Sequence, residues 1–260
     1  NCQFRTIQNT YNLMIRLPVT ELWSAEVGEV MNLTSSKIYK PRIPDIAESV
    51  FDILYLVFDL LAGIIFLLKA DGKVLFILYA LLTFVLCGGD AFHLVPRIIR
   101  ALRGNSEQIK RWLGTGLQVS SVTMTVFYVI LLYIWKFTFP GLKAPAALVA
   151  IIWITAIVRI VICMFPQNDW RGEGNLKLSV ASNAVFTLTG IAGIVLYVIS
   201  GNTCDYHMTR MAVAILISFA CYMPVAFLSR KLPGIGILMI PKTCAYIWII
   251  VMGLQLLYRQ

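Results

Sequence analysis

The chain of 260 residues is 59 % hydrophobic and only 13 % charged, and its formal net charge is +9. Soluble domains carry roughly 25 % charged residues, so a soluble form of this chain would expose apolar patches that aggregate. Because the basic residues lie mostly between apolar runs, without the basic and aromatic interleaving of a nucleic-acid-binding face, the composition indicates a membrane protein with no nucleic-acid partner.

The first 45 residues differ from the rest of the chain. They contain no basic segment followed by an apolar one, so no signal peptide is evident. We expect residues 1–45 to form a poorly defined N-terminal tail or extension, with Met31 as an alternative start. Residues 46–260 are then the membrane domain.

From residue 46 onward, long apolar runs alternate with short connectors. Seven runs have a length close to the roughly 20 residues that a helix needs to cross a hydrocarbon layer about 30 Å thick. They are continuously apolar, whereas the strands of a membrane barrel alternate. The connectors carry turn residues, such as Ala-Asp-Gly at 70–72. The sequence therefore predicts an all-α, polytopic bundle of about seven spanning helices, at 49–68, 74–96, 115–135, 145–165, 177–199, 209–229 and 235–257.

The Lys and Arg residues beside these runs predict an orientation, since cytoplasmic connectors carry an excess of both. Twelve lie on one side and six on the other. We expect a multi-pass protein of the plasma membrane, with its N-terminus cytoplasmic and its C-terminus outside. The twelve are Lys37, Lys40, Arg42, Arg97, Arg100, Arg103, Lys110, Arg111, Arg171, Lys177, Arg230 and Lys231, and the six are Lys69, Lys73, Lys136, Lys143, Arg210 and Arg259.

The connector after the second run carries Arg97, Arg100 and Arg103 at a spacing of three, with apolar residues between them. On a helix this spacing makes a basic stripe beside an apolar one, which suits a segment lying among anionic lipid headgroups. The alternative is that these residues only reflect the general excess of cytoplasmic Lys and Arg.

Ionisable residues inside the runs are the main candidates for function. A charge in mid-membrane costs about 3 kcal/mol on insertion scales, so such residues usually face the interior of a bundle. Asp52 and Asp59 are seven residues apart in the first run and share a face. In the second run, Asp90, His93 and Arg97 follow one another at i, i+3 and i+7, and they also share a face.

Alternation of helix direction places the polar residues of the later runs at the same depth as these. We therefore predict a polar, ionisable pocket in the cytoplasmic half of the bundle. The alternative is structural pairing, in which Asp59 or Asp90 forms salt bridges with Arg159 or Lys242. The predicted pocket residues are Asp52, Asp59, Asp90, His93, Arg97, Gln118, Arg159, Asn183, Tyr222, Lys242 and Tyr246.

The sequence contains little that indicates a metal site or a bound cofactor. His93 is one turn from Asp90 and is a candidate general base or metal ligand, although a helical histidine is most often structural. Zinc usually takes three protein ligands, and the other histidine, His207, is placed in a loop on the opposite side, so we expect no metal. The six cysteines form no Cys-x-x-Cys motif and read as packing residues. No motif identifies a cofactor.

Four segments of the chain are distinctive: Gly-Asp-Ala-Phe-His-Leu-Val-Pro-Arg at 89–97, Ser-Val-Thr-Met-Thr-Val-Phe-Tyr at 121–128, Met-Phe-Pro-Gln-Asn at 164–168 and Met-Ile-Pro-Lys-Thr-Cys-Ala-Tyr at 239–246. Together they resemble an uncharacterised family of bacterial multi-pass membrane proteins. The resemblance covers roughly residues 46–258 and implies the fold, but it supplies no activity.

Two characterised groups show a more distant likeness. The alkaline ceramidase and adiponectin receptor superfamily also has seven helices and a Phe-His pair near the second, as in Phe92-His93. However, Gly89 replaces its serine, and Lys242 and Tyr246 stand where its histidines would be. Lysoplasmalogenase-type membrane hydrolases share only the Gly-Asp at 89–90.

Two functions stay open at the level of sequence. One is a lipid-directed intramembrane hydrolase, in which Asp90 and His93 activate water and Asp59 assists. The other is a small-ligand transporter or membrane sensor, in which the same groups bind a polar ligand. Carboxylates paired with Arg159 and Lys242, with no cavity beside them, would instead favour a purely structural role.

Overall fold

The computed structural model describes residues 41–200, 208–229 and 231–259. Most of the predicted N-terminal tail, including Met31, lies outside these residues, as do His207 and Arg230.

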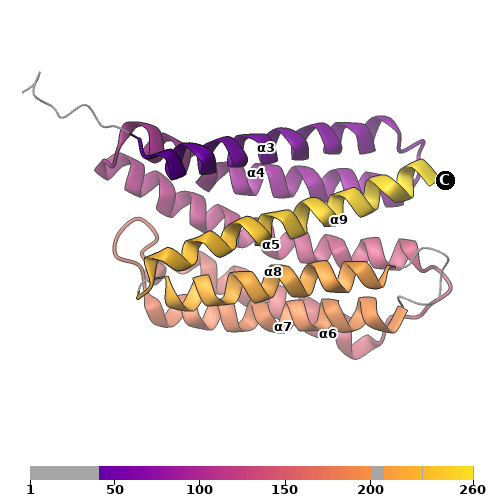
Figure 1. Ribbon diagram of the computed structural model, residues 1–260. Coiled ribbons are helices and arrows are strands. Elements are labelled where there is room, and N and C mark those ends of the chain that lie inside the picture. The colour runs from indigo at the N-terminus through magenta and orange to yellow at the C-terminus, as the bar shows by residue number, and fades with distance from the viewer. Residues whose placement is uncertain (1–40, 201–207, 230, 260) are drawn as a thin grey trace, which may run out of the picture. The chain divides into compact units, whose positions relative to one another are not determined.

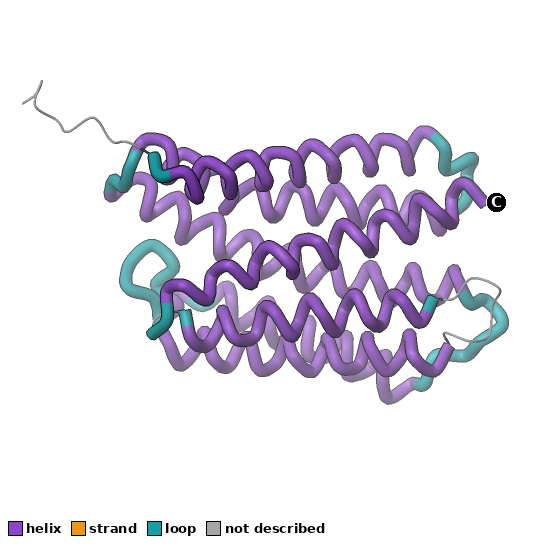
Figure 2. Tube along the Cα trace, in the orientation of Figure 1, coloured by secondary structure: helices purple, strands orange, loops and turns teal. Residues whose placement is uncertain are grey.

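The described residues form seven helices that are long and apolar enough to cross a membrane, with no strand among them (Figures 1 and 2). The predicted all-α, polytopic fold is therefore confirmed. Two short 3₁₀ segments, η1 (Pro166–Asn168) and η2 (Pro233–Leu238), occur in connectors. The helices are α3 (Ile43–Leu68), α4 (Val74–Arg103), α5 (Glu107–Thr138), α6 (Ala146–Met164), α7 (Leu176–Ser200), α8 (Thr209–Leu228) and α9 (Met239–Arg259).

Helices α4 and α5 are longer than the apolar runs that predict them. The predicted second span ends at 96, whereas α4 continues through Pro96 to Arg103 and ends at Gly104, whose φ is 89°. Helix α5 begins eight residues before its predicted span, and the Ser106 side chain caps it by accepting a hydrogen bond from the Ile109 N–H. The predicted spans stop at the first charged residues because they rest on apolar composition, but helical hydrogen bonding continues beyond those residues. The basic stripe after residue 96 is thus the end of α4.

Each helix packs against the next along the chain, and α9 returns to pack against α3, so the seven helices form a closed ring. Figure 1 shows α9 lying between α3 and α8. Helix α5 also contacts α7, and α4 also contacts α9, which fills the middle of the ring. The perimeter is lined by exposed apolar side chains such as Leu54, Leu68 and Ile154, a surface that suits lipid and would aggregate in water.

Aromatic side chains form the centre of the bundle. Tyr128 on α5 packs against Phe186 on α7 and Phe219 on α8, with ring centroids 5.2 and 5.4 Å apart. Its neighbour Phe127 packs against Tyr246 on α9 at 5.4 Å. Such aromatic pairs contribute about 1 kcal/mol each beyond their buried area. They tie α5, α7, α8 and α9 together at mid-bundle.

The half of the bundle beyond these rings is held by polar side chains that bond to backbone. Buried Trp135 on α5 donates its indole N–H to Ser200 Oγ at 2.6 Å and to the Leu196 carbonyl at 3.1 Å. Tyr197 on α7 donates to the Leu131 carbonyl at 3.0 Å. These hydrogen bonds hold α5 against α7.

Candidate functional site

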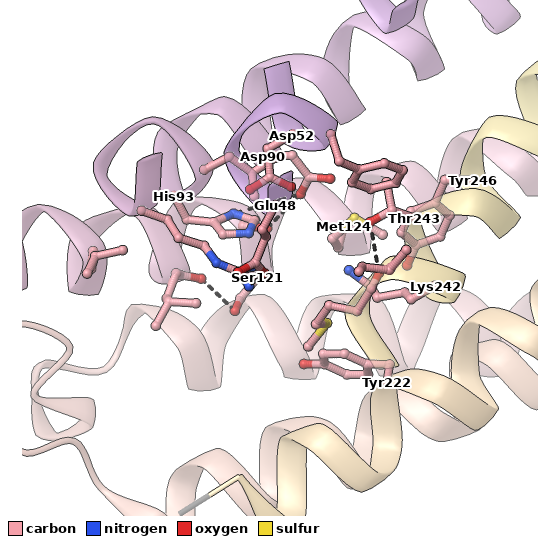
Figure 3. Close-up of a pocket in the computed structure, with 18 of the residues that line it drawn as sticks. Glu48, Asp52, Asp90, His93, Ser121, Met124, Tyr222, Lys242, Thr243 and Tyr246 are labelled. Carbon is pink, nitrogen blue, oxygen red and sulfur yellow. Dashed lines mark hydrogen bonds and ion pairs between the residues drawn. The ribbon is translucent and has the colours of Figure 1, made fainter. Parts of the chain in front are cut away.

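A cavity of about 340 Å³ lies inside the other half of the bundle, and every one of the seven helices contributes to its wall (Figure 3). This volume is at the lower end of the range for small-molecule sites. Glu48, Arg97 and Arg100 line it at the end where α3 begins and α4 ends. Eight of the predicted pocket residues line it: Asp52, Asp90, His93, Arg97, Arg159, Tyr222, Lys242 and Tyr246.

Asp90 is the best-anchored carboxylate of the cavity and is only 4 % exposed. Tyr55 on α3 donates its hydroxyl to Asp90 Oδ2 at 2.8 Å, and Ser120 on α5 donates to Oδ1 at 3.2 Å. The close approach of α5 depends on Gly89, because a Cβ at this position would overlap the Thr123 hydroxyl. The glycine before Asp90 therefore brings a hydroxyl-bearing helix within reach of the carboxylate.

His93 lies beside Asp90, but the two do not form a hydrogen bond. His93 Nδ1 is 3.9 Å from Asp90 Oδ1, which is beyond hydrogen-bond length. Figure 3 shows both side chains on the same side of the cavity as Asp52. We call Asp52, Asp90 and His93 the acidic side of the cavity.

The remaining predicted carboxylate, Asp59, does not line the cavity. It is fully buried one turn beyond Tyr55, and neither of its oxygens has a hydrogen-bond partner among the described residues. Asp52 does line the cavity, and its Oδ2 also has no such partner. The three predicted catalytic residues, Asp59, Asp90 and His93, are thus not all brought to the cavity.

Basic and aromatic residues from α6, α7, α8 and α9 form another part of the cavity wall, and Figure 3 shows Lys242 and Tyr222 across the cavity from His93. Arg159 on α6 is 1 % exposed, and its guanidinium carbon lies 3.4 Å from the centroid of the Phe186 ring. The ring centroids of Phe186 and Tyr222 are 6.0 Å apart. Lys242 Nζ lies 5.5 Å from the centroid of the Tyr222 ring and 4.9 Å from that of the Tyr246 ring. We call this set of five residues the basic side.

Arg159 makes no hydrogen bond or ion pair with any described residue, and its buried Nε and Nη1 atoms are left without partners. Lys242 likewise forms no ion pair with a described residue. None of the carboxylates at 52, 59 and 90 is paired with Arg159 or Lys242. The structural pairing considered from the sequence is thus not found in the described part of the chain. The ion pairs found there between permanently charged side chains are Arg42–Asp45, Glu48–Arg97 and Glu107–Lys110.

The pairing of Arg97 with Glu48 joins α4 to α3 where the cavity meets the helix ends. Glu48 was not among the predicted residues, since it directly precedes the predicted first span. It stands one helical turn before Asp52, so extending that span backward by a turn would have included it.

Two predicted pocket residues lie behind the cavity wall. Gln118 on α5 turns toward α6 and donates to the Cys163 carbonyl at 3.3 Å. Asn183 on α7 accepts a hydrogen bond from the Tyr222 hydroxyl at 2.8 Å. Asn183 therefore orients a lining residue and does not line the cavity itself.

No group of three or more His, Cys, Asp or Glu side chains close enough to hold a metal ion occurs in the described residues. The described cysteines, at 87, 163, 221 and 244, are all free thiols. The cavity wall thus combines the acidic side and the basic side with the paired Glu48 and Arg97 at its end.

Comparison with known proteins gives no match to this chain among family models, curated proteins or solved structures.

Proposed function

We propose that this chain is a multi-pass membrane protein that binds a small ligand bearing an anionic group in the bundle cavity, as a membrane sensor or a transporter. The single observation that carries the proposal is Arg159, a buried guanidinium that lines the cavity and has no acidic or hydrogen-bonding partner among the described residues.

A guanidinium inside a membrane bundle needs a counter-charge. Leaving such a buried charge unpaired costs several kcal/mol. The Phe186 ring covers one face of the Arg159 guanidinium, but a ring cannot accept its N–H groups in the guanidinium plane. A carboxylate or phosphate group accepts two of these N–H groups side by side. Lys242 also lines the cavity and adds a second cation to its wall.

The acidic side of the cavity indicates what the rest of the ligand carries. Asp52 lines the cavity and has one buried oxygen with no hydrogen-bond partner among the described residues, and both oxygens of Asp90 accept hydroxyl donors. Carboxylates accept hydrogen bonds from ammonium or hydroxyl groups. The preferred ligand is therefore a compact molecule with an anionic group at one end and an ammonium or hydroxyl group at the other.

The hydrolase alternative is supported less well. Asp90 is already bonded to Tyr55 and Ser120, and His93 Nδ1 lies 3.9 Å away. Asp59, the third proposed catalytic group, does not line the cavity. A general base needs a hydrogen-bonded orienting partner and access to water, and these contacts favour ligand binding over water activation.

We further propose that α3 begins on the cytoplasmic side of the plasma membrane, on the basis of the Lys and Arg excess at that end. The cavity then belongs to the cytoplasmic half. Exposed Arg100 and Arg103 are proposed to contact anionic headgroups, whereas Arg97 pairs with Glu48. The likeness to the uncharacterised bacterial family stays a prediction.

The test is ligand-induced thermal stabilisation of the purified protein in lipid nanodiscs. Amino acids, hydroxy acids and phosphomonoesters are compared with neutral analogues of the same size. We expect at least one anionic class to raise the Tm of the wild type but not of Arg159→Gln, with Lys143→Gln, an exposed connector variant, behaving as wild type. If no anionic compound acts, or if Arg159→Gln responds equally, the proposal is wrong. Uptake into proteoliposomes then separates a transporter from a sensor.

A further inference from the structure

A second hollow lies on the outside of the bundle, on the face formed by α4 and α5. Its volume is about 700 Å³, and it shares no lining residue with the bundle cavity. Its residues come from three places: Phe92, Val95 and Pro96 on α4, Trp112 and Gly116 on α5, and Arg171 in the connector between α6 and α7. We call it the α4–α5 groove.

The floor of the groove results from a close approach of two backbones. A Cβ at Gly116 would overlap the Phe92 carbonyl oxygen, so glycine lets α5 touch α4 directly there. Pro96 has no N–H, so the carbonyl of Phe92, four residues earlier, lacks its usual helical donor and is turned to Gly116. The two backbones therefore meet at the floor of the groove, and larger side chains such as those of Phe92 and Trp112 line it on either side.

The walls of the groove are apolar and accessible from the surroundings. The side chains of Phe92, Trp112 and Val95 are 58 %, 48 % and 45 % exposed, and they stand beside the glycine floor. Exposed apolar side chains on a spanning bundle face acyl chains, and Trp is the residue most typical of the level of the lipid headgroups. The walls therefore fit a hydrocarbon chain lying along the helices.

The end of the groove carries two guanidinium groups, those of Arg111 and Arg171. Both residues are exposed, and neither forms an ion pair with a described residue. Arg171 Nε donates to Thr115 Oγ1 at 3.1 Å, which orients the guanidinium across the groove. The connector is held close to α5 because Gly114 leaves room for the Trp170 carbonyl, which a Cβ there would overlap. Arg171 is thus fixed at the groove by backbone packing.

We propose that the α4–α5 groove is a binding site for one anionic phospholipid, with its phosphate between Arg111 and Arg171 and an acyl chain along Phe92 and Val95. A guanidinium pair is suited to a phosphate diester, since each guanidinium offers a planar pair of N–H donors. Basic pockets between spanning helices at the headgroup level select anionic lipids in this way. A free anion would make no use of the exposed apolar walls, so the occupant is a lipid.

The proposal is tested by native mass spectrometry of the full chain in detergent, titrated with phosphatidylglycerol or phosphatidylcholine. The test variant is Arg111→Gln/Arg171→Gln. The matched control is Lys177→Gln/Lys231→Gln, which removes two exposed cations outside the groove. We expect the wild type to bind one phosphatidylglycerol more tightly than phosphatidylcholine, the test variant to lose about tenfold in that affinity, and the control to change by less than about twofold.

Equal loss in the control and the test variant would show a general surface attraction and would overturn the site. Equal binding of the two lipids by the wild type, or unchanged affinity in the test variant, would also overturn it. Folding of both double variants is checked by their Tm in detergent without added lipid. Arg159→Gln is expected to bind phosphatidylglycerol as the wild type does, which separates this site from the ligand proposed for the cavity.

Discussion

Replacing Arg159 by Met is expected to change stability and ligand binding in opposite directions. Without ligand, the substitution removes a buried charge whose Nε and Nη1 atoms have no partner among the described residues. Each unsatisfied buried donor costs about 1–3 kcal/mol. The loss of the contact with the Phe186 ring, worth about 2 kcal/mol when desolvated, offsets part of this gain. We expect Arg159→Met to raise the free energy of unfolding by about 2 kcal/mol.

The same substitution is expected to weaken binding of an anionic ligand by at least about 30-fold, because truncating one partner of a buried charge pair costs about 2–5 kcal/mol. Stability is measured as the unfolding midpoint in mixed micelles with increasing denaturing detergent, and binding by titration in nanodiscs. Lys143→Met, in an exposed connector, is the control for loss of one positive charge.

A structural role for Arg159 predicts the reverse of the first result. If Arg159 held the bundle together through a buried pair, removing it would lower the free energy of unfolding by about 3–5 kcal/mol. A destabilised Arg159→Met variant would therefore refute the reasoning, whatever its ligand binding.

Three further variants test the surroundings of the site. Gly89→Ala is expected to lower the free energy of unfolding by about 2 kcal/mol, because its Cβ overlaps the Thr123 hydroxyl, and unfolding at wild-type detergent concentration would contradict this. Glu48→Gln leaves a partly exposed Arg97 and is expected to cost less than about 1 kcal/mol in the same assay; a larger loss would mean that this pair is an essential clamp. Asp90→Asn is expected to weaken the binding of ligands that carry an ammonium group by about tenfold and to leave the binding of other ligands unchanged, as measured by titration. An equal effect on both kinds of ligand would argue against contact between Asp90 and the ammonium group.

The fold follows from run length and composition, because a continuous apolar segment of spanning length has one stable backbone structure in lipid. The depth of the site also follows, since helices of alternating direction bring Asp52, Asp90, Arg159 and Lys242 to one level. What depth does not give is the rotation of each helix about its axis. Rotation is set by packing, and it turns Gln118 toward α6.

The sequence also could not show which glycines allow two backbones to approach each other. Glycines in membrane helices are common, and nothing in the pattern distinguishes Gly89 and Gly116, which allow α5 to touch α4, from Gly88 and Gly193, which have open space beside them. The groove between α4 and α5 depends on Gly116 and so appears only in three dimensions. The same holds for the stacking of Arg159 on the Phe186 ring, which joins residues from different helices.

The most direct measurement is a structure of the protein with the anionic compound that raises its Tm most. If buried charges gather around a shared interior site, additional density will fill the cavity and contact the Arg159 guanidinium, with its other end toward Asp52 or Asp90. An Arg159 side chain directed at lipid, or paired with Asp59 or Asp90 across a closed cavity, would contradict the account.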